Sequence, residues 1–337
     1  MKKSFKLLGA VLCILTLLGY GQNRETDYLS HVLEKMNVVE SVTYHCVIKA
    51  WEPGDKEPGY SVPIEIYEHV NPQDTAVGYS FLCASDKEFR QPLWVYDGTV
   101  FAYIEKEEKE VRIDDFTQKS PLPFRVIMPQ AFGCMKSILE YALNTQDSIV
   151  LSLKDEGKDY LMELSIHTPY QVEFFGKACY MPQNPYIYDP TSIYKIWISK
   201  EDDMPYRYRR EMQHSISEDI CSDFVYNPSG KGKIVAENYY PADYVRRIKG
   251  EKSQKATVDM TGKKAPDWTL TDMNGQKVSL SGIKSKVILL QFTGIGCGPC
   301  KISIPFLNRL RKEYAVNELE VLAVETWEGR NHLVKCM

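Results

Sequence analysis

The sequence has few histidines and none of the common nucleotide-binding or hydrolase motifs. Only 6 of its 337 residues are His, and none are spaced as HxH or HExxH, the patterns that place two imidazoles on one metal ion. No GxGxxG, Walker or GxSxG pattern occurs, so dinucleotide, phosphate-loop and serine-hydrolase chemistry have no support. A formal net charge of −4 gives no reason to expect a nucleic-acid partner. We therefore predict no metal, no cofactor and no nucleic acid.

Long apolar runs are scarce too, and the N-terminal run from Leu7 to Leu18 is short for a helix that spans a bilayer. Three lysines precede it, and Gly19 and Gly21 provide the small residues of a cleavage site, so residues 1–21 are predicted to be a cleaved signal peptide. Cys13 follows Leu12 rather than the small residue of a lipoprotein signal. We expect export to the periplasm or cell envelope without lipidation; an uncleaved anchor is the alternative.

Export places the cysteines in an oxidising compartment, where structural disulfides form and persist. Apart from Cys13 in the predicted signal peptide, five cysteines precede residue 250, and their connectivity cannot be deduced from the sequence. Buried free thiols are the equally plausible alternative for most of them. The five are Cys46, Cys83, Cys134, Cys179 and Cys221.

Residues 26–245 have the pattern of a β-rich domain with few helices. Apolar spacing predicts helices over residues 26–36 and 131–143, and period-two alternation begins at Val42. Asp97-Gly98 is typical of a hairpin turn. Two further hairpins are expected, around residues 155–158 and 201–205. The prediction is one large antiparallel sheet with a polar face and an apolar face, the latter covered by helices or folded around a ligand.

This region resembles the LolA-like lipoprotein carriers. The likeness rests on the leading helix, the many strands, the Val95-Tyr-Asp-Gly string, and the stretch Ile196-Trp-Ile-Ser-Lys followed by Met204-Pro-Tyr-Arg. The resemblance implies an open half-barrel that holds a lipid or lipoprotein segment. The alternative is a sheet that packs on its own helices and holds no ligand.

A basic stretch follows the sheet domain. Between Arg246 and Lys264 there are seven basic residues, two acidic ones and few apolar ones. We interpret residues 246–261 as a linker and place the domain boundary there.

The stretch from Val287 to Leu307 carries the clearest chemistry. An apolar run of strand length is followed by a glycine-rich turn, by Cys297-Gly298-Pro299-Cys300, and by apolar residues at helical spacing. A thiol at a helix N-terminus is acidified by the unpaired N–H groups and the helix dipole, so Cys297 is predicted to be the attacking sulfur and Cys300 the resolving one. Gly298 and Pro299 form the active-site turn, and Pro suits a first helical turn because its missing N–H has no partner there.

Zinc binding is the alternative for these cysteines. His332 and Cys336 would complete a Cys-Cys-His-Cys set with the CxxC pair. No second CxxC occurs, and the strand-to-helix context with Gly-Pro inside the motif favours redox chemistry.

Residues 262–324 resemble the thioredoxin-like TlpA/ResA-type thiol-disulfide oxidoreductases of bacterial envelopes. The matching pieces are APDWTL, an Asn-Gly turn, VSL, a buried strand, CGPCKISIPFL and LEVLAV, in that order. The resemblance implies a redox-active Cys297–Cys300 disulfide and a helix kinked at Pro305. It also implies protein thiols and disulfides as substrates, and an electron donor in the envelope.

The sequence departs from that family at several positions. The aromatic residue that commonly precedes the first Cys is absent. Many relatives carry a buried acid where this chain has Gln291 or Ser303, and neither side chain can act as a proton-transfer carboxylate. Glu325, at the end of the next predicted strand, is a candidate for that role.

Only thirteen residues follow Val324, whereas the family continues with a helix, a cis-proline strand and closing strands. We therefore expect residues 262–337 to be an incomplete thioredoxin-like βαβ domain, from a truncated or split frame or with a partner supplying the rest. The predicted fold class is α+β with an α/β part, and the predicted function is an exported thiol-disulfide oxidoreductase. The alternative is a lipid- or lipoprotein-binding module with a vestigial redox half. Peroxidase activity ranks third, because APDWxL also opens peroxiredoxins, which lack this CGPC pair.

Overall fold

The computed structural model describes residues 24–51, 55–117, 125, 127, 130–182, 189–212, 215–251, 260–294 and 298–325. The chain divides into two compact units, Met1–Lys252 and Ser253–Met337, which are described separately below. The described helices are all too short or too polar to cross a membrane.

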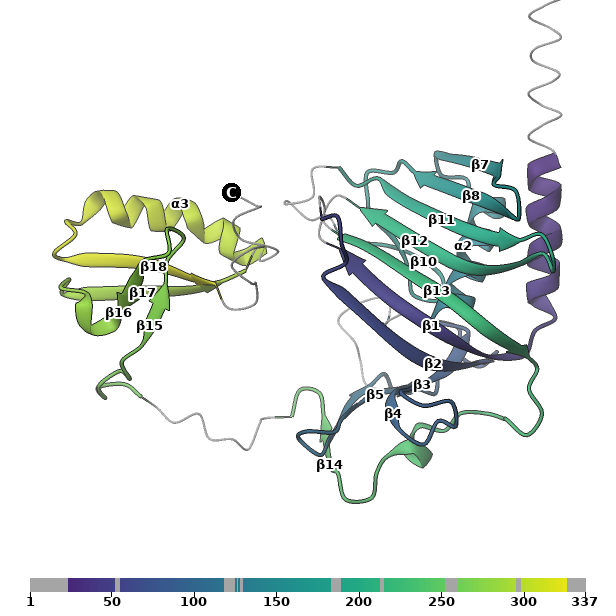
Figure 1. Ribbon diagram of the computed structural model, residues 1–337, viewed down its shortest axis with the longest axis horizontal. Coiled ribbons are helices and arrows are strands. Elements are labelled where there is room, and N and C mark those ends of the chain that lie inside the picture. The colour runs from purple at the N-terminus through teal and green to yellow at the C-terminus, as the bar shows by residue number, and fades with distance from the viewer. Residues whose placement is uncertain are drawn as a thin grey trace, which may run out of the picture. The chain divides into compact units, whose positions relative to one another are not determined.

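The first unit is built on one twelve-stranded sheet (Figure 1). In chain order its strands are β1 (Ser41–Trp51), β2 (Tyr60–Val70), β3 (Tyr79–Ala84), β4 (Pro92–Tyr96), β5 (Val100–Glu105), β6 (Glu110–Asp115), β7 (Ile149–Asp155), β8 (Asp159–Ile166), β11 (Ser192–Ser199), β12 (Met204–Met212), β13 (Ser215–Tyr226) and β14 (Val245–Ile248). Across the sheet the order is β14-β6-β5-β4-β3-β2-β1-β13-β12-β11-β8-β7. A small second sheet joins β9 (Val172–Phe174) and β10 (Ala178–Tyr180).

The three predicted hairpins are present. Strands β4 and β5 pair across Asp97-Gly98, where Gly98 has φ of 96°, a value that side chains other than glycine adopt only under strain. The other two hairpins are β7–β8 and β11–β12. The mixed α+β architecture with a large antiparallel sheet, predicted from these alternating patterns, is confirmed.

Two helices cover one face of the sheet. They are the helix over residues 24–37 and α2 (Ala131–Asn144), close to the predicted spans 26–36 and 131–143. Leu29, Val32 and Met36 from the first helix are fully buried in one cluster with residues of α2 and of the strands. The alternation seen from Val42 onward therefore arises because every second side chain of β1 packs beneath these helices.

The opposite face is not uniformly polar, which corrects the sequence-based expectation. A second buried cluster joins Tyr67 of β2, Leu82 of β3 and Val95 of β4 to Ile234 and Ala236 of the segment that follows β13. The short 3₁₀-helix η1 (Ala236–Tyr239) belongs to that segment. All six residues of β3 are buried, because this half of the sheet is covered on both faces.

The strand β14 also corrects the predicted linker. The predicted linker begins at residue 246, but residues 246–248 pair in parallel with β6, with Arg246 opposite Val111. The side chain of Arg247 reaches back to Glu110, and both ends of the pairing are held by backbone hydrogen bonds to Lys109 and Ile113. Arg247 and Lys249 thus pair with Glu110 and Asp114 of β6, and β14 forms the edge of the sheet. The remaining bounds of the predicted linker and domains stay predictions.

The second unit contains a hairpin and a βαβ unit. The hairpin is β15 (Thr269–Thr271) and β16 (Lys277–Ser279), with Gly275 of the predicted turn at φ of 85°, and the 3₁₀-helix η2 (Leu280–Gly282) follows it. Strands β17 (Val287–Thr293) and β18 (Leu319–Glu325) pair in parallel, and α3 (Gly298–Glu313) lies between them in the chain. Among the described side chains of residues 260–325, none is buried.

Candidate functional site

The predicted redox motif lies at the junction of β17 and α3. Strand β17 ends at Thr293 and α3 begins at Gly298, the residue after Cys297. Cys297 itself lies outside the described residues, as do the side chains of Gly298 and Pro299. Cys300 is in the first turn of α3 and is partly exposed. Pro305 lies inside this helix, as predicted, and has no N–H for the carbonyl one turn earlier.

Cys300 differs from the cysteines of the first unit. It is disulfide-bonded, whereas Cys46, Cys83, Cys134, Cys179 and Cys221 are free. The Cys300 Sγ lies 3.7 Å from the carbonyl oxygen of Phe292. A disulfide sulfur has no proton to donate, so this contact becomes a weak hydrogen bond only in the reduced thiol.

Gln291 and Ser303, where the TlpA/ResA-type resemblance led us to look for an acid, are bonded to each other. Gln291 Nε2 donates to Ser303 Oγ at 2.8 Å, linking β17 to α3. The Ser303 hydroxyl lies 2.6 Å from the carbonyl oxygen of Cys300, three residues before it. A neutral amide–hydroxyl pair thus holds the first turn of α3 against the strand, and neither group titrates near neutral pH.

Glu325 lies at the carboxyl end of β18, opposite Thr293 of β17 in the parallel register. In a parallel pair the carboxyl ends meet at one edge, so Glu325 is at the edge from which the cysteine motif continues. A groove of about 200 Å³ reaches this residue. It is lined by Trp268, Leu270, Thr271, Asp272, Val278 and residues 322–325. A proton-transfer role for Glu325 stays a prediction.

The part of the chain that the structure describes contains no arranged set of metal ligands. No group of three or more His, Cys, Asp or Glu side chains is arranged there to hold an ion. The residues of the zinc alternative other than Cys300, namely Cys297, His332 and Cys336, lie outside that part.

A buried carboxylate holds the N-terminus of α2. Glu68 of β2 accepts hydrogen bonds from the backbone N–H groups of Phe132 and Gly133, both at 3.0 Å, and from the hydroxyl of Tyr44. The two N–H groups have no partner within the helix, and the side chain of the N-cap residue Gln130 makes no capping hydrogen bond. The Glu68 carboxylate therefore caps the helix from a neighbouring strand. Burial raises the pKa of Glu68 to about 7, against the lowering effect of its three donors. A single acid inside an alternating strand gave no sequence signal for this role.

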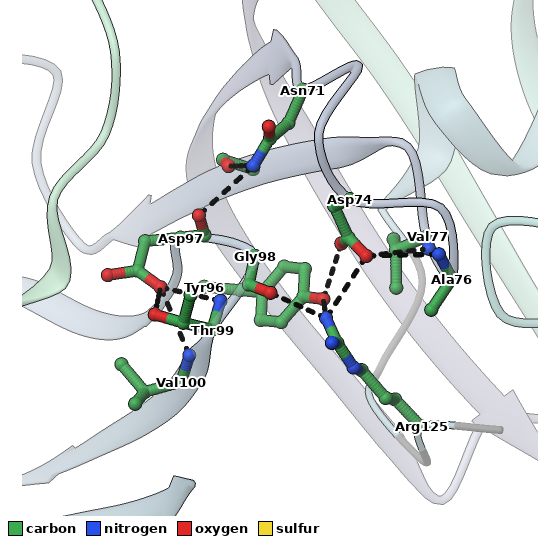
Figure 2. Close-up of polar contacts among 11 residues, drawn as sticks. Asn71, Asp74, Ala76, Val77, Tyr96, Asp97, Gly98, Thr99, Val100 and Arg125 are labelled. Atoms are coloured by element: carbon green, nitrogen blue, oxygen red, sulfur yellow. Dashed lines mark hydrogen bonds and ion pairs between the residues drawn. The ribbon is translucent and has the colours of Figure 1, made fainter. Parts of the chain in front are cut away.

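A second buried ionic cluster surrounds Asp74 (Figure 2). Arg125 Nη1 lies 3.1 Å from Asp74 Oδ1 and donates to the Gly98 carbonyl oxygen at 2.6 Å. Tyr96 donates to Asp74 Oδ2 at 2.5 Å, and Asn71 Nδ2 donates to the Asp97 carbonyl oxygen at 3.1 Å. The cluster ties the loop after β2 to the β4–β5 turn. Among the described residues, none of the buried side-chain nitrogen or oxygen atoms that lack a hydrogen-bond partner belongs to this cluster, which indicates a structural role.

Sequence comparison with known proteins concerns the second unit. Residues 261–334 match the model of the AhpC/TSA family. The thiol-disulfide oxidoreductase ResA of Bacillus anthracis is 36% identical over 67 residues, 20% of this chain and 39% of that protein. The thioredoxin-like protein YneN of Bacillus subtilis is 40% identical over 72 residues, 21% of this chain and 42% of that protein.

The C-terminal region is therefore a thioredoxin-like region of the AhpC/TSA family, related to ResA and YneN, and the predicted resemblance is confirmed for it. The chain spans about two fifths of the length of these curated relatives. Their names describe a thiol-disulfide oxidoreductase and a thioredoxin-like protein.

Solved structures similar to the chain match its larger part. LprF from Mycobacterium bovis has a TM-score of 0.35 at 8% identity, covering 65% of this chain and 98% of LprF. A LolA superfamily protein from Nitrosomonas europaea has a TM-score of 0.24 at 10% identity, covering 64% of this chain and 98% of that protein. The expected LolA-like relatives are thus among the matches, but similarity at this level supports no argument about function.

Proposed function

We propose that this chain is an exported thiol-disulfide oxidoreductase that exchanges disulfides with envelope proteins through Cys297 and Cys300. The observation that carries the proposal is the disulfide-bonded Cys300 in the first turn of α3, directly after a strand in a ResA-related region. We take Cys297 as its partner, because the two positions are one helical turn apart and Cys297 directly precedes the helix.

In this proposal Cys297 is the nucleophile. Its thiolate attacks a substrate disulfide, forming a mixed disulfide and releasing one substrate thiol. The Cys300 thiolate then attacks Cys297 Sγ, which releases the second substrate thiol and closes the intrachain disulfide. The dipole of α3 favours the thiolate form of Cys297, which directly precedes the helix. The Gln291–Ser303 pair fixes the first turn of α3, and with it the position of Cys300.

The redox step is tested with insulin as the protein disulfide and dithiothreitol as the reductant. The full chain should accelerate insulin reduction, Cys297→Ser should abolish the acceleration, and Cys300→Ser should accumulate a mixed disulfide with insulin. Cys179→Ser, a partly exposed free cysteine of the first unit, is the matched control and should behave like wild type. Rates equal to dithiothreitol alone would contradict the proposal.

Export is tested separately. N-terminal sequencing of the protein recovered from a bacterial envelope fraction should begin after Gly21. An unprocessed N-terminus together with recovery from the cytoplasm would contradict export and leave the redox chemistry unaffected. The lipid- or lipoprotein-binding alternative for the first unit stays a prediction, because the described residues offer no specific observation in its favour.

A further inference from the structure

Two of the five free cysteines of the first unit meet across neighbouring strands. Cys46 of β1 and Cys221 of β13 are directly opposite in the antiparallel register, although 175 positions apart in the sequence. Their sulfur atoms are 3.6 Å apart. We propose that Cys46 and Cys221 form a structural disulfide when the chain folds in an oxidising compartment.

The backbone geometry suits this bond. Directly opposite residues of an antiparallel pair have Cα atoms about 4.5 or 5.5 Å apart, and both values fall within the range of about 4.4–6.8 Å found across disulfides. The sulfur atoms must approach to about 2.05 Å, which side-chain rotation can provide without moving the strands. The strand register therefore identifies Cys46 and Cys221 as a pair. The spacing of the cysteines in the sequence could not identify it.

The other free cysteines lack such a partner geometry. Cys83 contacts Gln130, its Sγ lying 3.0 Å from Oε1, and Cys179 contacts the carbonyl of Lys177. Cys134 is on α2, away from any cross-strand register position. One pair among these five cysteines leaves three as reduced thiols.

The bond forms by two exchange steps with a disulfide of the compartment, RSSR, as the oxidant. One cysteine thiolate attacks RSSR, giving a mixed disulfide and one RSH; the second cysteine then displaces the second RSH. Two electrons and two protons pass from the cysteine pair to RSSR, so the products are one intrachain disulfide and two RSH.

The burial of Cys46 and Cys221 determines the stage of folding at which the disulfide can form. Cys46 is 0% and Cys221 4% exposed, so an oxidant cannot reach either sulfur in the folded unit. Burial also raises the pKa of Cys221 well above its usual value, which keeps the thiol protonated and unreactive. The disulfide therefore closes during folding, before helix 24–37 and α2 cover this face. Once formed, it resists reduction for the same reason.

The test is peptide mapping of the full chain synthesised in vitro in a buffer of oxidised and reduced glutathione. After denaturing alkylation and trypsin digestion, peptides 36–49 and 211–231 should appear as one linked species, lighter than their sum by two hydrogens. The peptides with Cys83 and Cys134 should be alkylated. A chain synthesised in reduced glutathione, folded and only then given the oxidised form should link at least tenfold more slowly.

Unlinked, alkylated Cys46 and Cys221 in the first sample would overturn the proposal, as would linkage of either to Cys83 or Cys134. Equal linking rates in the two samples would overturn its folding-stage part. The same mapping on a Cys297→Ser/Cys300→Ser chain should give the same linked peptide, so this result is independent of the proposed oxidoreductase function.

Thermal unfolding gives a second readout. A reductant present during unfolding should lower the midpoint of the oxidised first unit by roughly 5–10 °C, because the bond closes a long loop. This shift should vanish in Cys46→Ala and persist in Cys83→Ala, which creates a cavity at an equally buried cysteine. If Cys46→Ala does not fold, Cys221→Ala serves in its place. A shift that persists without Cys46 or Cys221 would contradict the bond.

Discussion

Gln291 on β17 and Ser303 on α3 are hydrogen-bonded to each other next to the backbone of Cys300, with 2.8 Å between Nε2 and Oγ. The Ser303 hydroxyl also lies 2.6 Å from the Cys300 carbonyl oxygen. Both positions are those at which the resemblance led us to look for a buried acid. The site therefore holds its second cysteine by neutral hydrogen bonds, and any proton acceptor for Cys300 must be another group.

Placing a carboxylate at this point should change the acidity of the second cysteine. In a Cys297→Ser background, Gln291→Glu should raise the pKa of the Cys300 thiol by about one unit, because a nearby negative charge disfavours the thiolate. The measurement is the rate of iodoacetamide alkylation of Cys300 against pH. Gln291→Leu, which removes the hydrogen bond without adding charge, is the control. Equal pKa values in the two variants, or a lower one in Gln291→Glu, would show that position 291 is electrostatically remote from the thiol.

The two buried carboxyl groups predict an unusual pH dependence of stability. Burial raises the pKa of Glu68 from 4.5 and of Asp219 from 3.8, in both cases to about 7. The folded state then binds more protons than the unfolded state between about pH 4 and 7, so the free energy of unfolding falls as pH rises through this window. Each group contributes on the order of 3 kcal/mol, present below its unfolded-state pKa and lost above about pH 7.

Urea unfolding of the first unit at pH 5 and pH 8 measures this effect. Glu68→Gln should remove about half of the difference between the two pH values, whatever it does to stability at either one, and Glu68→Gln/Asp219→Asn should remove most of it. Glu88→Gln, at an exposed carboxylate, should keep the wild-type difference. A wild type that is more stable at pH 8 than at pH 5 would refute the assignment of these two groups.

The ionic cluster of Figure 2 makes a prediction about the first unit's stability. Arg125→Met should destabilise it by about 3–5 kcal/mol, because the Asp74 side chain, 2% exposed, would keep a buried charge without its partner. Asp74→Asn/Arg125→Met should recover part of that loss. The measurement is the denaturation midpoint by circular dichroism. Arg90→Met breaks an exposed pair with Glu88 and should change stability by about 1 kcal/mol or less; an equal loss in both single variants would argue against a buried pair.

Most of the strand pattern could be predicted because local signals agree with the fold. Asp97-Gly98 favours a tight turn, and the alternation of apolar residues from Val42 favours a strand with one buried face. The structure has both the turn and the strand. Strand β3 is harder to predict, because it is buried on both faces and the alternation of apolar and polar residues is lost. Strand β14 reads as a charged linker from sequence because its partner β6 supplies the opposite charges, and only the fold brings them together.

The candidate site also has parts that the sequence predicts and parts that it does not. A CxxC between a strand and a helix is a local signal, and α3 does begin directly after Cys297. The Cys46–Cys221 contact and the Glu68 cap depend on register between segments far apart in the sequence. No spacing rule reports such contacts, because loops of any length can join two paired strands.

The two units should differ sharply in stability. The first buries two clusters of apolar side chains, with Phe132 of α2 at 0% exposure, whereas none of the described side chains in residues 260–325 is buried, and Phe292 and Phe306 are 64% and 49% exposed. The free energy of unfolding is a small difference between the stabilisation from burial and the cost in chain entropy. The second unit should therefore open at a far lower free energy than the first.

Hydrogen exchange followed by mass spectrometry should show slow exchange in β1 and β13 and fast exchange in β17 and β18. Phe132→Ala should lower the unfolding free energy of the first unit by about 3–5 kcal/mol, while Phe306→Ala should change that of the second by less than about 1 kcal/mol. Exchange in β17 as slow as in β1 would mean that the second unit is stabilised by contacts other than the described ones.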